Sequence, residues 1–256
     1  MIFTDTHTHL YLKQFDNDRI QVIVDAINEG VKYMLLPNID SSTITSMMDV
    51  CKSFPENCFP MIGVHPTSAK QNYKEELAIV EKQLTINKFI AIGEIGIDLY
   101  WDKTFIEEQE YSLRYQIDLA KKYKLPIVIH SRDSFDEIFK VLKDVNYPDL
   151  NGVFHCFSGN VEEAEQIIDL GFKLGIGGVL TFKNSGLEEV VKEIDLEHIL
   201  LETDAPYLAP VPFRGKRNTS SYIPFIADKI AKIKNIPVKE VAEITTDNAI
   251  SLFKFI

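Results

Sequence analysis

Residues 1–37 read MIFTDTHTHLYLKQFDNDRIQVIVDAINEGVKYMLLP, and this stretch carries the pattern of one strand–helix–strand unit. An apolar β-type run comes first, at Met1–Thr6, and another closes the stretch at Lys32–Pro37. Between them, apolar side chains follow the i, i+3, i+4, i+7 spacing of an amphipathic helix, at Ile20, Ile23, Val24 and Ile27. Gly30 then provides a natural helix stop. The turn after the first run, residues 5–10, contains no glycine, unlike the first turn of a dinucleotide-binding fold.

The same unit recurs along the chain. Eight apolar β-type runs are expected as strands, at Met1–Thr6, Lys32–Pro37, Phe59–Val64, Phe89–Glu94, Pro126–His130, Gly152–His155, Phe172–Gly177 and His198–Glu202. Helical patterns lie between and after them, at Asn17–Glu29, Glu107–Lys122, Val161–Leu170, Tyr222–Lys234 and Val238–Phe253. An open doubly wound sheet would typically use only five or six strands. The pattern therefore predicts an α/β protein, with one (β/α)8 TIM barrel as a single domain over residues 1–256.

Composition and charge narrow the function classes. The 256 residues are 45% hydrophobic and 25% charged, which is ordinary globular usage. The apolar runs are too short to span a membrane, and the first residues do not resemble a signal peptide. Three cysteines without zinc-finger spacing indicate a reducing compartment, so we expect a cytoplasmic protein. A net charge of −11 argues against a broad duplex-binding surface, although it leaves room for a small local site.

Histidines and carboxylates gather where the predicted strands end. Five of the six histidines of the chain fall at the carboxyl ends of predicted strands, which is the active-site face of a TIM barrel. The strand-end residues that can bind a metal or a substrate are His7, His9, His65, Glu94, His130, His155 and Asp204. Side chains in a strand alternate, so His7 and His9 should point to the same side, into the barrel mouth. His198, at the start of the last strand, is expected to be structural or exposed.

Imidazoles and carboxylates together suit Zn²⁺, Mn²⁺ or Fe²⁺. Any one of these histidines alone is more commonly a hydrogen-bonded core residue, but their joint occurrence favours a metal site. Four histidines with Glu94 and Asp204 are enough to hold two ions that share a bridging carboxylate. His65 is either a substrate contact or a loop-packing residue. Cys156 should point away from the mouth as a small apolar side chain.

These motifs resemble those of the TatD-related metal-dependent hydrolases, a branch of the amidohydrolase superfamily. The resemblance covers essentially the whole chain and rests on six stretches in order, DTHTHL (5–10), GVHP (63–66), GEIGID (93–98), HSR (130–132), HCFSG (155–159) and ETDAPY (202–207). It implies two divalent cations per chain, with zinc, magnesium and manganese as the candidates. It also implies phosphodiesterase activity on DNA, often exonucleolytic from the 3′ end.

The resemblance further implies a role for each ligand. His7, His9 and Asp204 would hold one ion, and His130 and His155 the other, with Glu94 bridging. Asp204 would also accept a proton from the attacking water, so Glu94 and Asp204 are the candidate catalytic residues.

Local positive charge on the same face bears on a DNA substrate. The loop after the last strand carries Arg214, Lys216 and Arg217, and Arg132 follows the predicted ligand His130. Arginine suits bidentate phosphate contacts, so this loop is either a small phosphate clamp or a solvated basic loop. Tyr207 and Trp101 lie near the same mouth and are either stacking platforms for an unpaired base or packing residues.

The leading hypothesis is thus a metal-dependent deoxyribonuclease that acts on single-stranded or frayed strand ends. A first alternative keeps the metal site but hydrolyses an ester or amide, for example the ester of an aminoacyl-tRNA. A second is a non-catalytic metal-binding scaffold. The sequence leaves the metal, the physiological substrate, the directionality and the oligomeric state open, and it implies no protein partner.

Overall fold

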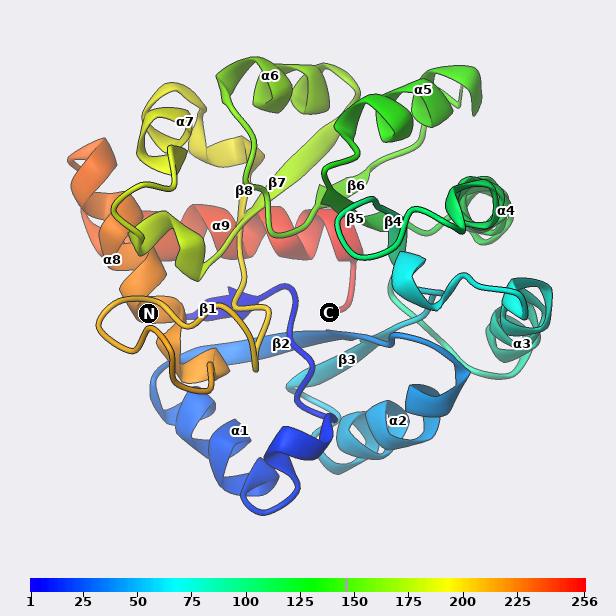
Figure 1. Ribbon diagram of the computed structural model, residues 1–256. Coiled ribbons are helices and arrows are strands. Elements are labelled where there is room, and N and C mark those ends of the chain that lie inside the picture. Colours follow the sequence, from blue (N-terminus) through cyan, green and yellow to red (C-terminus); the bar gives the residue numbers. More distant parts are fainter. Residues whose placement is uncertain (146) are drawn as a thin grey trace.

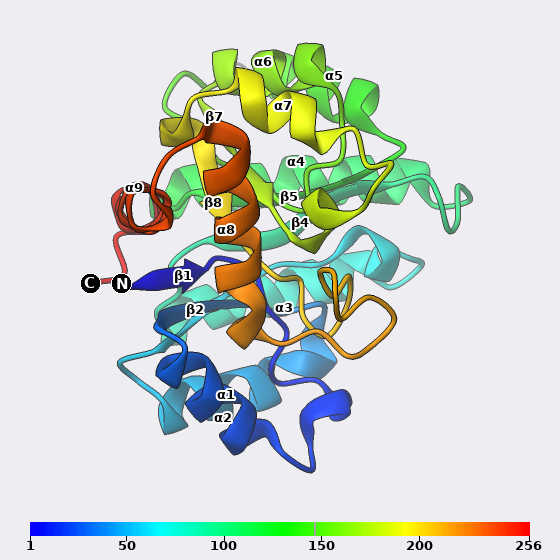
Figure 2. The same ribbon diagram turned by 90° about the vertical axis from the view of Figure 1, so that its left-hand side faces the viewer.

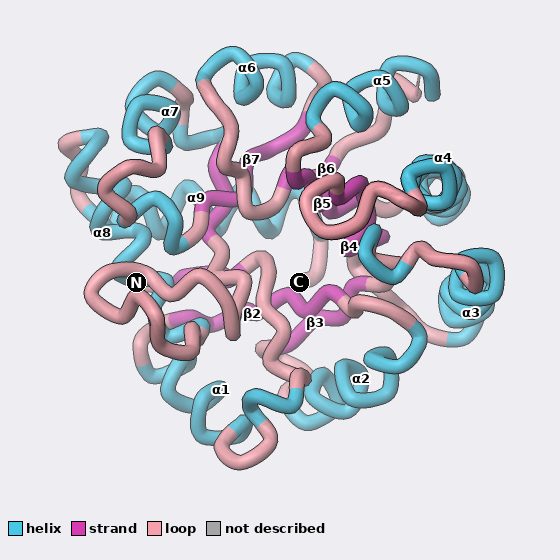
Figure 3. The backbone as a smooth tube through the Cα atoms, in the orientation of Figure 1, coloured by secondary structure: helices cyan, strands magenta, loops and turns pink. Residues whose placement is uncertain are grey.

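The computed structural model describes residues 1–145 and 147–256. Within these ranges eight parallel strands form the centre of the molecule: β1 Phe3–Asp5, β2 Val31–Pro37, β3 Cys58–Met61, β4 Ile92–Asp98, β5 Ile127–Arg132, β6 Gly152–Phe154, β7 Phe172–Ile176 and β8 Ile199–Leu201. Helices surround them (Figure 1): α1 Arg19–Asn28, α2 Ile44–Ser53, α3 Tyr73–Ile86, α4 Ile106–Tyr123, α5 Phe135–Val145, α6 Val161–Asp169, α7 Leu187–Glu193, α8 Ile223–Lys234 and α9 Val238–Phe253. The strands lie inside the ring of helices (Figure 3).

The strands form two hydrogen-bonded ladders that meet at both edges. These two ladders are parallel sheets: one has the strand order β1-β2-β3, and the other has the strand order β4-β5-β6-β7-β8. A bridge between Ile62 and Ile92 joins β3 to β4, and a bridge between Thr8 and Ala205 lies beyond the ends of β1 and β8. The Thr6 N–H also donates to the Leu201 carbonyl at 2.9 Å. The ring is thereby completed, and the predicted (β/α)8 barrel is confirmed.

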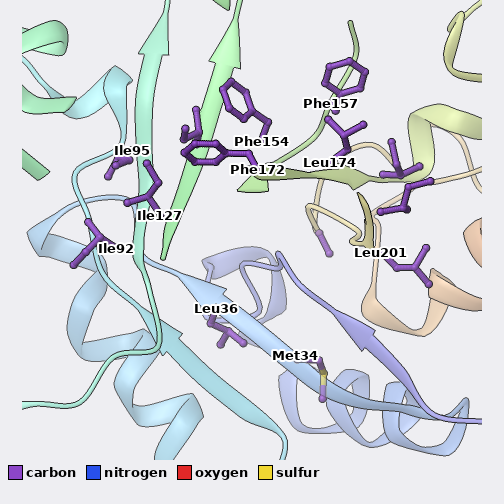
Figure 4. Packing of buried hydrophobic residues seen from close by; sticks show 14 of the residues in the cluster. Met34, Leu36, Ile92, Ile95, Ile127, Phe154, Phe157, Phe172, Leu174 and Leu201 are labelled. Carbon is purple, nitrogen blue, oxygen red and sulfur yellow. The ribbon is translucent and has the colours of Figure 1, made fainter. Parts of the chain in front are cut away.

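Alternating side chains divide the core into an inner and an outer layer. The inner cluster takes single residues from six positions around the barrel, Leu35, Met61, Ala91, Val128, Val153 and Leu200. Ala249 and Phe253 of α9 join this cluster from below. Figure 2 shows α9 across the amino ends of the strands, on the side opposite the long loop after β8. The neighbouring strand residues Met34, Leu36, Ile127, Phe154 and Leu201 belong to the larger outer cluster (Figure 4).

The two-residue period of a strand places functional side chains directly above the inner layer. His130, His155 and Glu202 each follow an inner-layer residue by two positions, after Val128, Val153 and Leu200. The apolar side chains of the inner layer therefore lie directly beneath the polar residues of the barrel mouth.

No described helix is both long and apolar enough to cross a membrane.

Strand β4 differs from the prediction. The expected strand Phe89–Glu94 in fact runs from Ile92 to Asp98, so Glu94 lies inside it rather than at its end. Ile92 pairs with Ile127 while Ile95 pairs with Ile129, so β4 contains one extra residue between these pairs. Such a bulge re-aims the side chains within it. This accounts for the position of Glu94 among the histidines.

Two buried glutamines of α4 hold the strand ends next to the site. The Gln109 amide accepts from the Asp98 N–H at 2.8 Å and donates to the Asp98 carbonyl at 3.3 Å. Gln116, seven residues later on the same helix face, does the same for Val64, at 2.7 and 3.3 Å. Each side chain thus completes a strand's backbone hydrogen bonding beyond its regular ladder. These hydrogen bonds fix the backbone at Val64 and Asp98, and His65 is the residue directly after Val64.

Gly96 predicts a large effect of a single methyl group. Its φ is +145°, and a Cβ there would lie 2.0 Å from the backbone oxygen of His130. We expect Gly96→Ala to lower the free energy of unfolding by about 3 kcal/mol or more, since backbone strain adds to a clash with backbone. Gly186→Ala is the matched control, because φ is +74° but nothing lies within 4 Å of its Cβ position. Urea unfolding measures the free energy of unfolding of both variants. Equal losses of stability in the two variants would show that the clash at Gly96 does not contribute.

Candidate metal centre

The carboxylate of Glu94 is the centre of the polar cluster. Its Oε1 lies 2.7 Å from His155 Nε2, 2.9 Å from His130 Nδ1 and 3.2 Å from His65 Nε2. Its Oε2 lies 3.2 Å from His7 Nε2 and 3.7 Å from His9 Nε2. The carboxylate itself is buried. The five histidines that the sequence placed at strand ends therefore converge on one side chain.

Asp204 joins this cluster from the end of β8. Its Oδ1 lies 3.4 Å from His9 Nε2 and 3.8 Å from His7 Nε2. The Asp204 N–H donates to the His7 carbonyl at 2.9 Å, which fixes the two strand ends against each other. The Asp204 side chain is 16% exposed and that of Glu94 only 3%, so Asp204 faces the open cavity more than Glu94 does.

Asp5 explains why the ends of β1 and β8 meet in this geometry. Its buried carboxylate accepts from the Thr203 N–H at 2.9 Å, from the Thr203 hydroxyl at 2.6 Å and from the His7 N–H at 3.3 Å. Burial raises the pKa of this carboxyl group to about 7, against the effect of those hydrogen bonds. Asp5 therefore links the segment that carries His7 to the one that carries Asp204.

The second ring nitrogen of His9 decides which nitrogen faces the cluster. The Tyr11 hydroxyl donates to the Pro37 carbonyl at 2.6 Å, so it accepts from His9 Nδ1–H, 2.8 Å away. His9 Nε2 then carries a lone pair directed at Asp204 and Glu94. This is the arrangement that orients a metal-ligating imidazole.

His65 has the opposite tautomer. The Thr67 backbone N–H can only donate, and it donates to His65 Nδ1 at 3.1 Å. The proton of the neutral ring is then on Nε2, which points at Glu94. Burial lowers the pKa of His65, which favours this neutral form. A protonated Nε2 donates a hydrogen bond and does not ligate a metal, so the site treats His65 differently from His9.

The donor set fits divalent cations. His9 Nε2, an acceptor, lies 3.2 Å from His7 Nε2 and beside the acceptor oxygens of Asp204 and Glu94. Such a gathering of lone pairs and negative charge in a buried site is unfavourable unless a cation lies between them. Three sets of possible ligand atoms in this cluster lie within 4.8 Å of one another: those of His7, His155 and Asp204, those of His7, His9 and Glu94, and those of His65, Glu94 and His130. The tautomer of His65 sets it apart from the other members of these sets. Nitrogen and carboxylate ligands together suit Zn²⁺ and Mn²⁺.

The charge state of the cluster follows from its burial. Burial by itself raises the pKa of Glu94, but the imidazoles of His155, His65 and His7 hold it well below its usual range. Burial lowers the pKa of His7. The pKa values of His130 and His155 are the exceptions. Burial opposes their rise, yet Asp98 and Glu94 raise the pKa of His130, and Glu94 and Glu202 raise that of His155 well above the ordinary value. Without metal, a proton on His155 thus balances part of the negative charge of Glu94.

The cluster lies at the bottom of a cavity of about 630 Å³. Its lining includes the predicted residues His9, His65, Glu94, His130, Arg132, His155, Asp204 and Tyr207, together with Trp101. His7 lies beneath this lining, fully buried. Arg214 and Arg217 do not line the cavity. The Arg217 guanidinium forms two hydrogen bonds with the Asp18 carboxylate, at 2.9 and 2.6 Å, and the Arg214 guanidinium lies over the Phe182 ring.

The expectation for Cys156 is wrong. This residue lines the cavity instead of pointing away from it. Strand β6 ends at Phe154, and Cys156 has a positive φ of 47°, so the alternation of a strand no longer applies at this position. The Cys156 N–H donates to Glu202 Oε1 at 2.6 Å.

Three side chains that support the cluster were not among the sequence candidates. Tyr11 contacts His9, Asp98 contacts His130 at 2.9 Å, and Glu202 lies 3.6 Å from His155 Nδ1. Tyr11 continues the alternation of His7 and His9, and that spacing was the available signal. Asp98 and Glu202 belong to the quoted motifs, but their contacts depend on strand register, which the sequence does not show.

Comparison with known proteins agrees with this geometry. The family model of the TatD related DNases matches residues 4–254. The chain belongs to the TatD related DNase family. An uncharacterized metal-dependent hydrolase of Bacillus subtilis, YabD, is 41% identical over 255 residues, which covers 99% of both chains. The Escherichia coli protein YcfH, also described as an uncharacterized metal-dependent hydrolase, is 31% identical over 99% of this chain and 96% of its own length.

Solved structures of TatD proteins share the fold. The crystal structure of YjjV, a TatD homologue of Escherichia coli, superposes with a TM-score of 0.92 at 29% identity, over 98% of both chains. A TatD family hydrolase from Entamoeba histolytica gives a TM-score of 0.85 at 25% identity, over 99% of this chain and 98% of that one. The barrel of this TatD family member is therefore the one that its solved relatives adopt.

Proposed function

We propose that this metal-dependent hydrolase of the TatD family cleaves phosphodiester bonds of DNA at single-stranded or frayed strand ends, from the 3′ end. The observation that carries the proposal is the convergence of four ligand histidines and two carboxylates on the floor of one cavity, with an arginine and two aromatic side chains among its lining. The cavity volume of about 630 Å³ is within the range of roughly 300–1,000 Å³ typical of small-ligand sites. A strand end fits such a space better than continuous duplex does.

In this proposal two cations share the ligands. His7, His9 and Asp204 would hold one, His130 and His155 would hold the other, and Glu94 would serve both. When bound, a pair of divalent ions lowers the pKa of water and stabilises the charge that develops on a phosphate oxygen.

Asp204 has the position of a proton acceptor. It touches the His7–His9 side of the cluster and also reaches the cavity, so its carboxylate can orient the attacking water and take its proton. The water oxygen forms a bond to phosphorus as the bond from phosphorus to the leaving sugar oxygen breaks. The leaving oxygen takes up a proton from solvent, and Asp204 returns the proton that it accepted, so the net reaction consumes one water. His65 Nε2–H supplies a neutral donor on the other side of Glu94, suited to a non-bridging phosphate oxygen.

The rim offers one cation and two aromatic rings to the rest of the substrate. Among the described residues that line the cavity, Arg132 is the one Lys or Arg side chain. Trp101 is 69% exposed and Tyr207 47% exposed, which leaves both rings free to stack on an unpaired base. A single cation fits a short substrate, in keeping with the overall charge of −11. Arg214 would extend phosphate contacts outside the cavity, and Arg217 would do so only by leaving Asp18.

The direct test is hydrolysis of end-labelled oligonucleotides by protein that has been stripped of metal with a chelator and then reloaded with Mg²⁺, Mn²⁺ or Zn²⁺. The proposal expects stepwise shortening from the 3′ end, faster on single strands than on blunt duplex, and none with chelator. Hydrolysis of aminoacyl or small esters without any cleavage of DNA would instead favour the ester or amide hydrolase. A fully metal-loaded protein that hydrolyses neither would favour the scaffold.

Arg132→Ala is expected to raise KM for a 3′-labelled single strand by about 10-fold with little change in kcat, because one charge-assisted phosphate contact is lost. Steady-state kinetics at fixed metal measures both constants. Lys183→Ala is the control, since Lys183 is an exposed cation that does not line the cavity. Equal KM values for the Arg132 variant and the unchanged protein would remove Arg132 from the substrate site.

A further inference from the structure

Asp98, the last residue of β4, uses its two carboxylate oxygens in two different directions. Oδ2 lies 2.9 Å from His130 Nε2. Oδ1 accepts from the backbone N–H groups of Tyr100 and Trp101, at 3.0 and 3.2 Å. The side chain is only 1% exposed. One buried carboxylate thus joins a histidine of the cluster to the turn that carries the exposed Trp101.

The chemistry of these contacts fixes the His130 ring. Backbone N–H groups only donate, and an ionised carboxylate only accepts, so His130 Nε2 must bring the proton to Oδ2. His130 Nδ1 lies 2.9 Å from Glu94 Oε1, which also only accepts, so without metal this nitrogen donates to Glu94. With Asp98 holding the proton on Nε2, Nδ1 is the nitrogen that a cation would deprotonate and bind. The ring presents the nitrogen opposite to that of His9, whose Nε2 faces the cluster.

The surroundings hold Asp98 in place. Gln109 clasps its backbone N–H and carbonyl, and the next N–H, of Leu99, donates to the Arg132 carbonyl at 3.0 Å. The Arg132 guanidinium lies over the Tyr100 ring, 3.8 Å from its centroid, and 5.3 Å from that of Trp101. The turn, the arginine and the histidine therefore form one connected unit with Asp98 at its centre.

We propose that Asp98 is a positioning residue that directs His130 Nδ1 toward the second cation and couples the occupancy of that site to the Tyr100–Trp101 turn at the rim. The inference rests on the proposed function in one respect, that His130 is a metal ligand. It adds that binding of the second cation changes the environment of the Tyr100–Trp101 turn, where the substrate stacks.

Asp98→Asn separates the two halves of this role. If the amide oxygen stays with the two backbone N–H groups, the amide NH2 faces His130 and favours the tautomer whose Nδ1 carries the proton. If the amide turns over, the NH2 meets two backbone donors instead. Asparagine therefore cannot satisfy both sides, whereas its volume is unchanged. Asp102→Asn is the matched control in the same loop, because Asp102 is exposed and accepts only from the Thr104 N–H at 2.9 Å among the hydrogen bonds found for its side chain.

Zinc titration followed by tryptophan fluorescence tests the coupling, since Trp101 is the single tryptophan of the chain and Zn²⁺ does not itself absorb. We expect the unchanged protein and Asp102→Asn to show a saturable change in Trp101 emission. Asp98→Asn is expected to bind one of its ions about 10–100-fold more weakly and to lose that change. Unaltered zinc affinity and an unaltered Trp101 response in Asp98→Asn would overturn the inference.

Nitrogen-15 NMR of the zinc-loaded, unsubstituted protein needs no variant to fold. The inference expects the His130 ring to coordinate zinc through Nδ1 and to keep a hydrogen-bonded proton on Nε2. Coordination through Nε2 would contradict the role of Asp98 while leaving the metal site intact. If the unchanged protein binds none of Zn²⁺, Mn²⁺ and Mg²⁺ at the cluster, the proposed function itself fails, and the two failures are thereby distinguished.

Discussion

Glu94→Gln is expected to lower DNA hydrolysis by about 10³–10⁴-fold and to abolish binding of at least one divalent ion. Both oxygens of this carboxylate are committed, Oε1 to His130 and His155 and Oε2 to His7. Glutamine keeps one acceptor oxygen but removes the negative charge. Its NH2 group would donate to a histidine nitrogen that the cation needs. The bridging role therefore cannot survive the exchange, although the volume of the side chain is nearly the same.

Two measurements follow this variant: ion content by elemental analysis after exhaustive dialysis, and hydrolysis of a 3′-labelled single strand. Glu197→Gln makes the same chemical change at an exposed residue beside His198, before β8, and is expected to leave both values unchanged. A Glu94→Gln protein that retains both ions and most of its activity would refute the bridging assignment. Circular dichroism establishes that each variant is folded.

Asp204→Asn is expected to lower kcat by about 10²–10⁴-fold while leaving KM within a few-fold, because the loss falls on proton transfer and not on substrate contacts. The asparagine retains one oxygen toward His9 but accepts no proton from water at neutral pH. Metal affinity should fall by less than in Glu94→Gln, since Asp204 approaches only His7 and His9 whereas Glu94 meets five imidazoles.

The comparison must be made at saturating metal, so that occupancy does not limit the rate. Asp228→Asn, at an exposed residue of α8 paired with Lys232, is the control. If kcat of Asp204→Asn at full occupancy equals that of the unchanged protein, another group accepts the proton. A rise in KM alone, with kcat unchanged, would place Asp204 with the substrate contacts instead.

The overall architecture was predictable because each strand–helix unit is encoded locally. The periodicity of residues 17–29 and the stop at Gly30 gave α1 to within two residues at each end, and Val238–Phe253 coincides with α9. Strand β4 was displaced because its bulge depends on pairing with β5, which periodicity does not report. The apolar pattern ends near Glu94, while the backbone pairing continues to Asp98.

The histidines were predictable as a group because barrel topology brings strand ends together whatever their distance in sequence. Their individual roles were not. The tautomer of His65 depends on the Thr67 N–H, and the orientation of His130 depends on Asp98, four residues after Glu94 on a bulged strand. Arg217 looked like a free cation, but its partner Asp18 lies 199 residues away in sequence. Such long-range pairs leave no local signal.

The central claim, two cations on either side of Glu94, is tested most directly by anomalous diffraction from crystals loaded with Mn²⁺ or Zn²⁺. We predict two anomalous peaks about 3.5–4 Å apart, one contacted by His7, His9 and Asp204 and the other by His130 Nδ1 and His155, with the Glu94 carboxylate between them. No peak at the cluster in fully loaded crystals, or a single peak ligated by His65 Nε2, would contradict it.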